Sequence, residues 1–171
     1  MSRLEFLNAK IVDSKEARFW INSWKMKGDT IVFTNGCFDI LHKGHVVYLA
    51  KAAQLGTRMI VAVNSDASVR EQGKGPERPI NPEDARATVL AALGFVDLVV
   101  VFDAETPLEL IRQLHPDVLV KGADYDPQET NPSSKKYIVG SEFMRENNGS
   151  VAVIDLEDGF STTSIVNKLK N

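Results

Sequence analysis

The sequence predicts an α/β fold whose sheet is mainly parallel and whose helices cover both faces of that sheet. Short apolar runs alternate with segments of helical periodicity along the 171 residues, the pattern expected of strand-helix-strand units. Runs such as Leu98-Val99-Val100-Val101-Phe102 are apolar at every position, which indicates strands buried on both faces. Polar clusters follow where these runs end, and open parallel sheets bind ligands at that edge.

The first elements are predicted from a cap, an apolar run and a glycine. Asp13-Ser14 caps a helix whose apolar face is expected to carry Ala17, Trp20, Ile21 and Trp24. A strand over residues 31–34 leads into a helix over 45–55, which Gly56 should stop because glycine readily adopts the conformation that ends helices. A second strand is expected over residues 59–63.

The remaining elements repeat this order. Asn81-Pro82-Glu83-Asp84 is a capped helix start with proline in the first turn, and that helix should run to about residue 93. Further strands are expected at 98–102, 118–120 and 151–154, and further helices at 107–114, 142–147 and 163–169. Residues 65–79 and 124–134 lack a regular pattern, and irregular segments of this length often carry function. The predicted sheet is therefore doubly wound and Rossmann-like, with five strands.

Composition and charge exclude several classes of protein. The net charge of −3 lacks the basic surplus of a nucleic-acid-binding protein. The single cysteine, Cys37, rules out an internal disulfide and fits a reducing compartment. No apolar stretch has the length of a membrane span, and the N-terminus lacks the apolar core of a signal peptide. We therefore expect a cytoplasmic protein that binds neither nucleic acid nor a membrane.

Residues 35–45, Asn-Gly-Cys-Phe-Asp-Ile-Leu-His-Lys-Gly-His, are the most informative segment. They join a strand to a helix, so His42 and His45 fall at a helix start, three residues apart and on one face. Such a helix start offers unpaired N–H groups and the positive end of the helix dipole, and Gly44 leaves room for a close ligand. The segment predicts a phosphate-binding site, with a metal-site fragment or structural histidines as the alternatives.

A second helix start and several cations extend this predicted site. Ser161-Thr162-Thr163 offer hydroxyls and backbone N–H groups to a triphosphate, although such residues also serve as plain helix caps. Lys74 and Arg78 lie in the loop after the second strand, which is either a lid over the nucleotide or a solvated surface loop. Lys121 ends a strand, whereas Arg86 on a helix suits either a ligand or a structural ion pair.

Two of these strings resemble the signatures of a known family. Residues 36–45 resemble the G-x-F-D-x-x-H-x-G-H signature of the cytidylyltransferase-like nucleotidyltransferases, whose two histidines contact the nucleotide phosphates. Residues 159–163 resemble the second signature of that family, G-I-S-T-T. Many members carry R-T-x-G-I-S-T-T, and Leu156 stands at the position of that arginine. The resemblance therefore implies that other cations, from Lys74, Arg78 or Lys121, offset more of the triphosphate charge.

Four strings narrow the resemblance, at residues 35–39, 75–81, 120–125 and 157–163. Over residues 31–169 the chain resembles the adenylyltransferase domain of the bacterial ADP-heptose synthesis enzymes. That likeness implies transfer of AMP from ATP to D-glycero-β-D-manno-heptose 1-phosphate, giving pyrophosphate and ADP-heptose for lipopolysaccharide or surface-glycan synthesis.

The likeness also implies how the chain is organised. A helical extension over residues 1–28 is expected before a nucleotidyltransferase domain over 29–171. Related domains are often fused behind a sugar kinase, which 171 residues cannot hold, so a separate heptose kinase is expected to act upstream without required contact. A homodimer is the expected assembly.

The resemblance assigns roles to individual residues. Catalytic contacts with the phosphates are implied for His42, His45, Lys74 and Lys121. Nucleotide contacts are implied for Cys37, Phe38, Gly44, Gly122, Asp124, Ser161, Thr162 and Thr163. Contacts with the acceptor are implied for Asn35, Asp39, Asn64, Asp66, Arg78 and Arg86. Mg²⁺ should arrive with ATP, because it prefers oxygen ligands and retained water, and no His and Cys cluster suits a transition metal.

Two rival functions stay open. A cytidylyltransferase acting on glycerol 3-phosphate or phosphoethanolamine would share both signatures, but the missing arginine and the string Lys121-Gly122-Ala123-Asp124-Tyr125 argue against it. A catalytically silent nucleotide-binding module would keep the fold without the reaction, although both histidines and the Ser-Thr-Thr string are intact. Pyrophosphate release from ATP or CTP with candidate phosphates separates these possibilities.

Overall fold

The computed structural model describes residues 2–73, 75, 77–157 and 159–169. The strands are β1 (Ile11–Val12), β2 (Ile31–Gly36), β3 (Arg58–Asn64), β4 (Leu98–Phe102), β5 (Val118–Gly122) and β6 (Ser150–Ile154). The helices are α1 (Arg3–Asn8), α2 (Ser14–Lys25), α3 (Lys43–Ala53), α4 (Asp66–Glu71), α5 (Glu83–Ala91), α6 (Leu108–Leu114), α7 (Ser141–Glu146) and α8 (Thr162–Leu169).

The described strands form one sheet in the order β1-β4-β3-β2-β5-β6, and every neighbouring pair is parallel. The predicted α/β class is confirmed, but the predicted number of five strands was wrong, because the described part of the chain forms six. The missed strand, β1, pairs Ile11 and Val12 with Val99 and Val100 of β4. Two residues are too few to give a periodic signal, so β1 exists only through its pairing with a neighbour that lies far along the chain.

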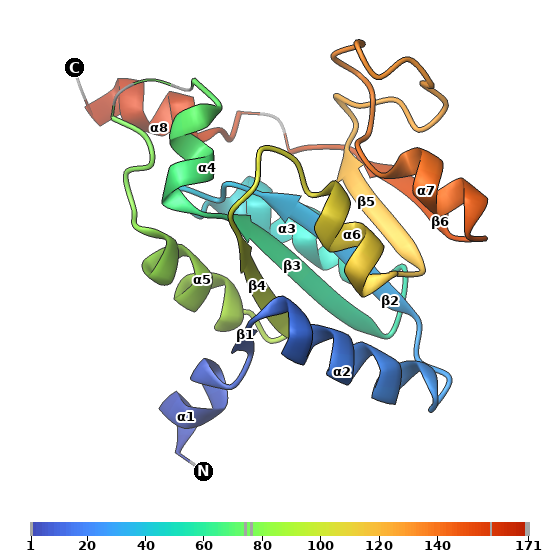
Figure 1. Cartoon of the computed structure of the whole chain (residues 1–171). Coiled ribbons are helices and arrows are strands. Elements are labelled where there is room, and N and C mark those ends of the chain that lie inside the picture. Colours follow the sequence, from blue (N-terminus) through green and yellow to red (C-terminus); the bar gives the residue numbers. More distant parts are fainter. Residues whose placement is uncertain (1, 74, 76, 158, 170–171) are drawn as a thin grey trace.

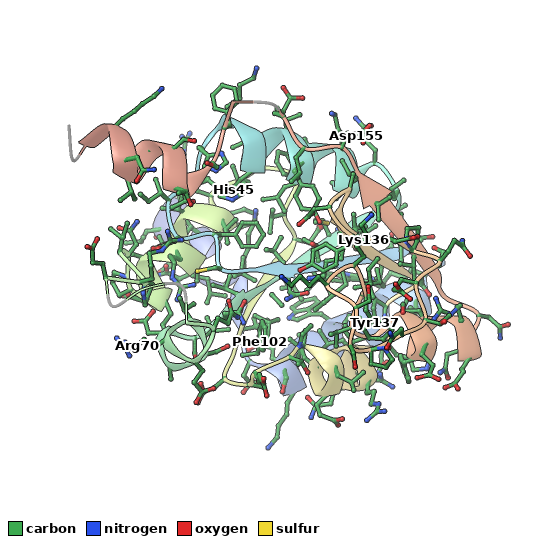
Figure 2. All side chains as sticks on the ribbon, turned by 90° about the horizontal axis from the view of Figure 1, so that it is seen from above. His45, Arg70, Phe102, Lys136, Tyr137 and Asp155 are labelled. Atoms are coloured by element: carbon green, nitrogen blue, oxygen red, sulfur yellow. The ribbon has the colours of Figure 1, made fainter. Side chains whose placement is uncertain are left out.

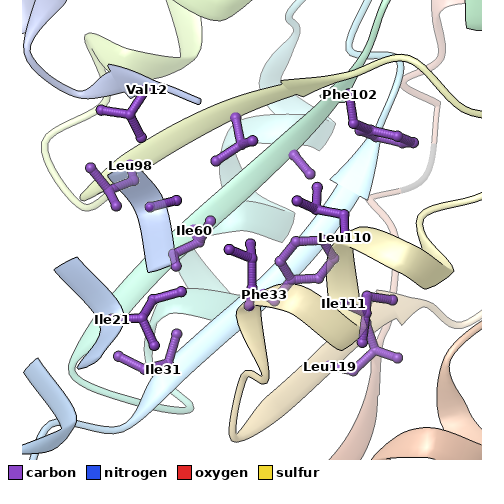
Figure 3. Close-up of a cluster of buried hydrophobic side chains, with 14 of the residues drawn as sticks. Val12, Ile21, Ile31, Phe33, Ile60, Leu98, Phe102, Leu110, Ile111 and Leu119 are labelled. Carbon is purple, nitrogen blue, oxygen red and sulfur yellow. The ribbon is translucent and has the colours of Figure 1, made fainter. Parts of the chain in front are cut away.

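Helices cover both faces of the sheet, because successive strand residues point to opposite sides. On one face, Ile21 of α2 and Ile111 of α6 pack with Phe33 and Ile60, as Figure 3 shows. On the other face, α3 and α5 pack against the alternate strand positions such as Val32. In Figure 1, α2 and α6 accordingly lie in front of the sheet and α3 behind it.

The N-terminal segment joins this architecture. Ala17, Ile21 and Trp24 of α2 are buried as predicted. Trp20 is 40% exposed instead and leans on Trp24, with ring centroids 6.0 Å apart, because it lies at the edge of the apolar stripe. A division of the chain at residue 28 stays a prediction.

Another difference concerns the segment of residues 65–79, which was predicted to be irregular. Its first part forms α4, whose N-terminus is capped by Ser65: the Ser65 Oγ accepts the backbone N–H of Ser68 at 3.0 Å. A six-residue polar helix is too short for periodicity to indicate it.

The strand order reverses between β2 and β5, because the strands that follow β2 in the chain lie first on one side of it and then on the other. The carboxyl ends of β2 and β5 therefore frame the crevice where such sheets bind ligands. No helix among the described residues is both long and apolar enough to cross a membrane.

Candidate active site

A cavity of about 340 Å³ opens at the carboxyl ends of β2 and β5. It brings together most of the predicted site residues: Asn35, Cys37, Phe38, Asp39, His42, Gly44, His45, Arg78, Lys121, Gly122, Asp124, Ser161 and Thr162. Asn64, Asp66, Arg86 and Thr163 do not line it. Lys74 lies outside the described residues. We call this space the nucleotide cavity, after the ligand that the sequence predicts for it.

Both histidines belong to the first turn of α3, which begins two residues earlier than predicted, at Lys43. His42 is the N-cap, and its Nδ1 accepts the backbone N–H of His45 over 3.4 Å, a long hydrogen bond. The two imidazoles stack with centroids 3.8 Å apart and planes inclined by 21°. The rings of Phe38 and His45 form a T-shaped pair, with centroids 5.4 Å apart and planes inclined by 70°. The stack therefore presents two ring edges to one cavity from a rigid helix start.

Gly44 has a steric role in addition to the predicted one. A Cβ at this position would come within 3.1 Å of the His42 ring and of the Phe160 Cβ. The missing side chain thus lets the segment that carries Phe160 approach α3, which closes one wall of the nucleotide cavity. The missing side chain therefore brings the walls of the site together, and room for a ligand at this position stays a prediction.

Burial keeps the histidine pair neutral near pH 7. It lowers the pKa of His45 to about 4, assisted by the neighbouring His42 and opposed by the carbonyl of Ile40. Burial also lowers the pKa of His42 below its ordinary value. Two neutral rings stack without charge repulsion, and each carries one N–H donor.

Tyr48 is a cavity residue that the sequence reasoning missed. Its hydroxyl lies 2.8 Å from the Oγ1 of Thr34, and that oxygen donates its own hydrogen to the carbonyl of Val120 at 2.9 Å. The tyrosine is therefore the donor in the first bond. These two hydrogen bonds connect α3 to β2 and β5 beneath the cavity. Burial raises the pKa of Tyr48 to about 12. The position, three residues after His45 on the same helix face, was the available signal.

Lys121 and Asn35 join the two central strand ends. The Lys121 Nζ donates to the Asn35 Oδ1 at 2.6 Å and lies 5.5 Å from the centroid of the Tyr125 ring. The amide oxygen and the ring fix an ammonium group in the wall of the nucleotide cavity. A fixed cation at the crevice suits an anionic ligand that carries several phosphates.

Asp39 braces the site rather than pointing into open space. Its carboxylate, 0% exposed, accepts the N–H groups of Ile80 and Asn81 at 2.8 and 2.9 Å and pairs with the guanidinium of Arg78. The aspartate thereby holds the loop after α4 against the histidine segment. Arg78 reaches the cavity wall from this anchor.

Arg86 forms a structural ion pair, one of the two roles that its sequence position suggested. Its side chain is 0% exposed and pairs with Asp66 at 2.7 Å. It also donates to the carbonyls of Asn81 and Cys37 at 2.9 and 2.7 Å. These bonds connect α5, α4 and the histidine segment behind the cavity. Arg86 and Asp66 therefore contact each other and neighbouring protein groups, and their predicted contact with the acceptor stays a prediction.

The C-terminal segment forms a wall that adjoins the histidines. The Ser161 Oγ accepts the N–H of Ser164 at 3.0 Å, so Ser161 caps α8, and Thr162 lines the cavity while Thr163 is exposed outside it. Glu157 holds this segment on α3 through Lys43 and Lys51, at 3.5 and 3.4 Å. The first signature and part of the second signature therefore lie side by side and line the same cavity.

Leu156 occupies the wall position where many members of the resembling family carry arginine. It is 54% exposed and lines the cavity together with Phe160. Its methyl groups stand close to Gly122, where an added Cβ would lie 3.2 Å from the Leu156 Cδ2. This wall is therefore apolar where a cation is otherwise common.

Comparisons with known proteins agree with this geometry. The chain is 55% identical over 143 residues to the bifunctional protein HldE of Campylobacter fetus and 49% identical over 160 residues to the HldE of Magnetococcus marinus. These alignments cover 84% and 94% of the chain but only 28% and 31% of the two relatives, so the chain spans about a third of their length.

Solved structures share the fold. The crystal structure of a lipopolysaccharide core biosynthesis protein from Thermoplasma volcanium matches with a TM-score of 0.57 and 26% identity, covering 76% of this chain and 98% of that one. A pantoate-beta-alanine ligase from Francisella tularensis matches with a TM-score of 0.59 and 16% identity, over 94% and 76% of the two chains, and indicates the fold alone. The family model described as cytidylyltransferase-like matches residues 33–168. With both signatures facing one cavity at the switch in strand order, the chain belongs to the cytidylyltransferase-like family.

Proposed function

We propose that the chain is an adenylyltransferase that moves AMP from ATP to D-glycero-β-D-manno-heptose 1-phosphate. The observation that carries this proposal is the stacked pair of neutral histidines at the start of α3, which lines the nucleotide cavity together with the cap of α8 and Lys121. The four strings that resemble the ADP-heptose synthesis enzymes support heptose 1-phosphate as the acceptor. So do the relatives named HldE and the lipopolysaccharide core biosynthesis protein of similar fold.

In the proposed reaction, an oxygen of the sugar 1-phosphate attacks the α-phosphorus of ATP. A new P–O bond forms, the bond from the α-phosphorus to the bridging oxygen breaks, and pyrophosphate leaves with the electron pair. A phosphate oxyanion is already a nucleophile, so no side chain has to become one. Catalysis then depends on alignment and on stabilising negative charge.

Each part of the cavity has a place in that scheme. The N–H groups of His42 and His45 donate to the α-phosphate oxygens. Lys121 offsets negative charge on the reacting phosphates, and Ser161 and Thr162 hold the triphosphate at the start of α8. Their exposure to one cavity supports these roles.

Magnesium enters this proposal as part of the substrate, MgATP. Among the described residues there is no group of three or more His, Cys, Asp or Glu side chains placed to hold a metal ion. Mg²⁺ is commonly bound through nucleotide phosphates, retained waters and at most one or two carboxylates. We further propose that the protein works in the cytoplasm, as a homodimer, on heptose 1-phosphate made by a separate kinase.

A panel of pyrophosphate-release assays tests the function. ATP and CTP are each paired with D-glycero-β-D-manno-heptose 1-phosphate and with glycerol 3-phosphate. We expect release mainly from ATP with the heptose phosphate. Preference for CTP with glycerol 3-phosphate would assign the chain to the rival cytidylyltransferases, and silence with every pair would favour the non-catalytic module.

A further inference from the structure

A second cavity, of about 450 Å³, adjoins the nucleotide cavity. The two share one wall, made of Asn35, Gly36, Cys37, Lys121 and Tyr125. The shared wall consists of the carboxyl ends of β2 and β5 and the start of the loop after β5. The crevice at the switch in strand order is therefore divided into two compartments.

The compartments lie on opposite sides of the sheet. In Figure 2, which views the molecule from above, His45 lies on one side of the strands and Tyr137 and Phe102 lie on the other. His45 lines the nucleotide cavity, and Tyr137 lines the second cavity. A ligand that spans both must cross the sheet edge at Lys121.

We propose that the second cavity binds the polyhydroxylated ring of the acceptor sugar phosphate, with Glu71, Glu105 and Tyr137 as hydroxyl-recognising residues. This inference rests on the proposed function and names the subsite for its acceptor. Carboxylates accept hydrogen bonds from hydroxyls, and the phenol both accepts and donates. All three side chains line the cavity, together with the amides of Asn64 and Gln72.

The carboxylates of the second cavity favour the acceptor sugar over the triphosphate of ATP. Two carboxylates disfavour the triphosphate of ATP on this side of the sheet, whereas hydroxyl groups are neutral donors that carboxylates bind well. The ammonium of Lys121 lies in the dividing wall, held at 2.6 Å by the Asn35 Oδ1. The phosphate of the acceptor therefore reaches the wall at Lys121, and the attacked α-phosphorus lies just beyond it beside the histidines.

Hydrogen bonds hold the segments that carry Glu71 and Glu105 before a ligand arrives. Ser65 donates a hydrogen bond to Asp103, and the Ser68 Oγ donates to the carbonyl of Ala104 at 2.7 Å. These bonds tie α4, which ends at Glu71, to the segment that leads to Glu105. The Ser68 Oγ also accepts a hydrogen bond from the side-chain amide of Asn64 at 2.9 Å. This bond orients the buried Asn64 side chain. A site held in this way loses little entropy when it binds a rigid ring.

The test compares Glu71→Gln and Glu105→Gln with wild type in steady-state pyrophosphate release. Each loss of a charged acceptor should raise the KM for D-glycero-β-D-manno-heptose 1-phosphate by roughly 10-fold or more, while the KM for ATP moves by less than about twofold. Both glutamates are exposed, so the variants should keep their thermal midpoint. Glu109→Gln is the matched control, because Glu109 is an exposed α6 carboxylate that pairs with Arg112 and lines neither cavity.

Binding without turnover gives a second readout. Titration calorimetry with the heptose 1-phosphate alone should show the same loss of affinity in both variants and none in the control. Unchanged KM and affinity in an active enzyme would overturn the subsite while leaving the proposed function standing. A wild-type protein that releases no pyrophosphate with any sugar 1-phosphate would instead refute the proposed function, and the subsite with it.

Discussion

Replacing Asp39 with asparagine separates a bracing role from a substrate-binding role. The sequence predicted contact with the acceptor, yet the carboxylate is wholly buried and accepts the N–H groups of Ile80 and Asn81. It also forms an ion pair with Arg78, whose side chain is only 16% exposed. Asparagine keeps the shape and one oxygen acceptor, but it leaves the guanidinium without its counter-charge.

The expected cost follows from that geometry. Removing one partner of a buried ion pair costs about 3–5 kcal/mol, because the other charge stays desolvated. The oxygen retained by asparagine still accepts N–H donors, and Arg78 keeps some contact with water, so we expect the lower end, about 3 kcal/mol. For a chain of this length, that loss lowers the thermal midpoint by roughly 6–12 °C.

Urea unfolding and thermal melts of wild type, Asp39→Asn, Arg78→Gln and the double variant measure the effect. The double variant should recover about 2 kcal/mol relative to the sum of the single changes, because it leaves no unpaired charge. Residual activity should show a larger change in kcat than in the KM for the acceptor. A stability loss below about 1 kcal/mol, together with a KM for the acceptor that rises strongly, would refute the bracing role.

Four further outcomes are expected. His42→Ala should lower kcat by roughly 10²- to 10³-fold with little change in melting temperature, as for one lost oxyanion donor; near-normal turnover would contradict the phosphate role. Because the folded-state pKa of His45 is about 4, only the unfolded state takes up this proton between pH 6.5 and 4. Stability is therefore full above pH 6.5 and falls by about 2 kcal/mol as the pH drops to 4, after allowance for partial exposure. His45→Asn should flatten that part of the urea-derived profile. Tyr48→Phe should cost about 1–2 kcal/mol in the same unfolding assay, because Thr34 loses its buried donor. Leu156→Arg should lower the KM for ATP by roughly two- to fivefold, the worth of an exposed charge pair, and no change would show that this wall lies away from the triphosphate.

The sequence by itself determined the elements whose signal is local. The five predicted strands, present as β2 to β6, and the helix after the histidine segment are long enough for an apolar run or a 3.6-residue period to indicate them. The placement of His42 and His45 at a strand-to-helix junction was equally local, because both lie within one turn of the helix they start. The cavity that the two histidines line is also lined by Phe160, Ser161 and Thr162 of the second signature.

Only the tertiary structure decided how buried polar groups find their partners. Asp39 accepts N–H groups 41 and 42 positions away, and Lys121 donates to Asn35 across 86 positions. β1 exists only because β4 offers it a free edge. Local sequence cannot specify such pairs, since a carboxylate that binds a ligand and one that anchors a loop are the same residue type. Burial makes the difference: a desolvated charge must be paired, and the identity of its partner depends on which distant segment the fold brings beside it.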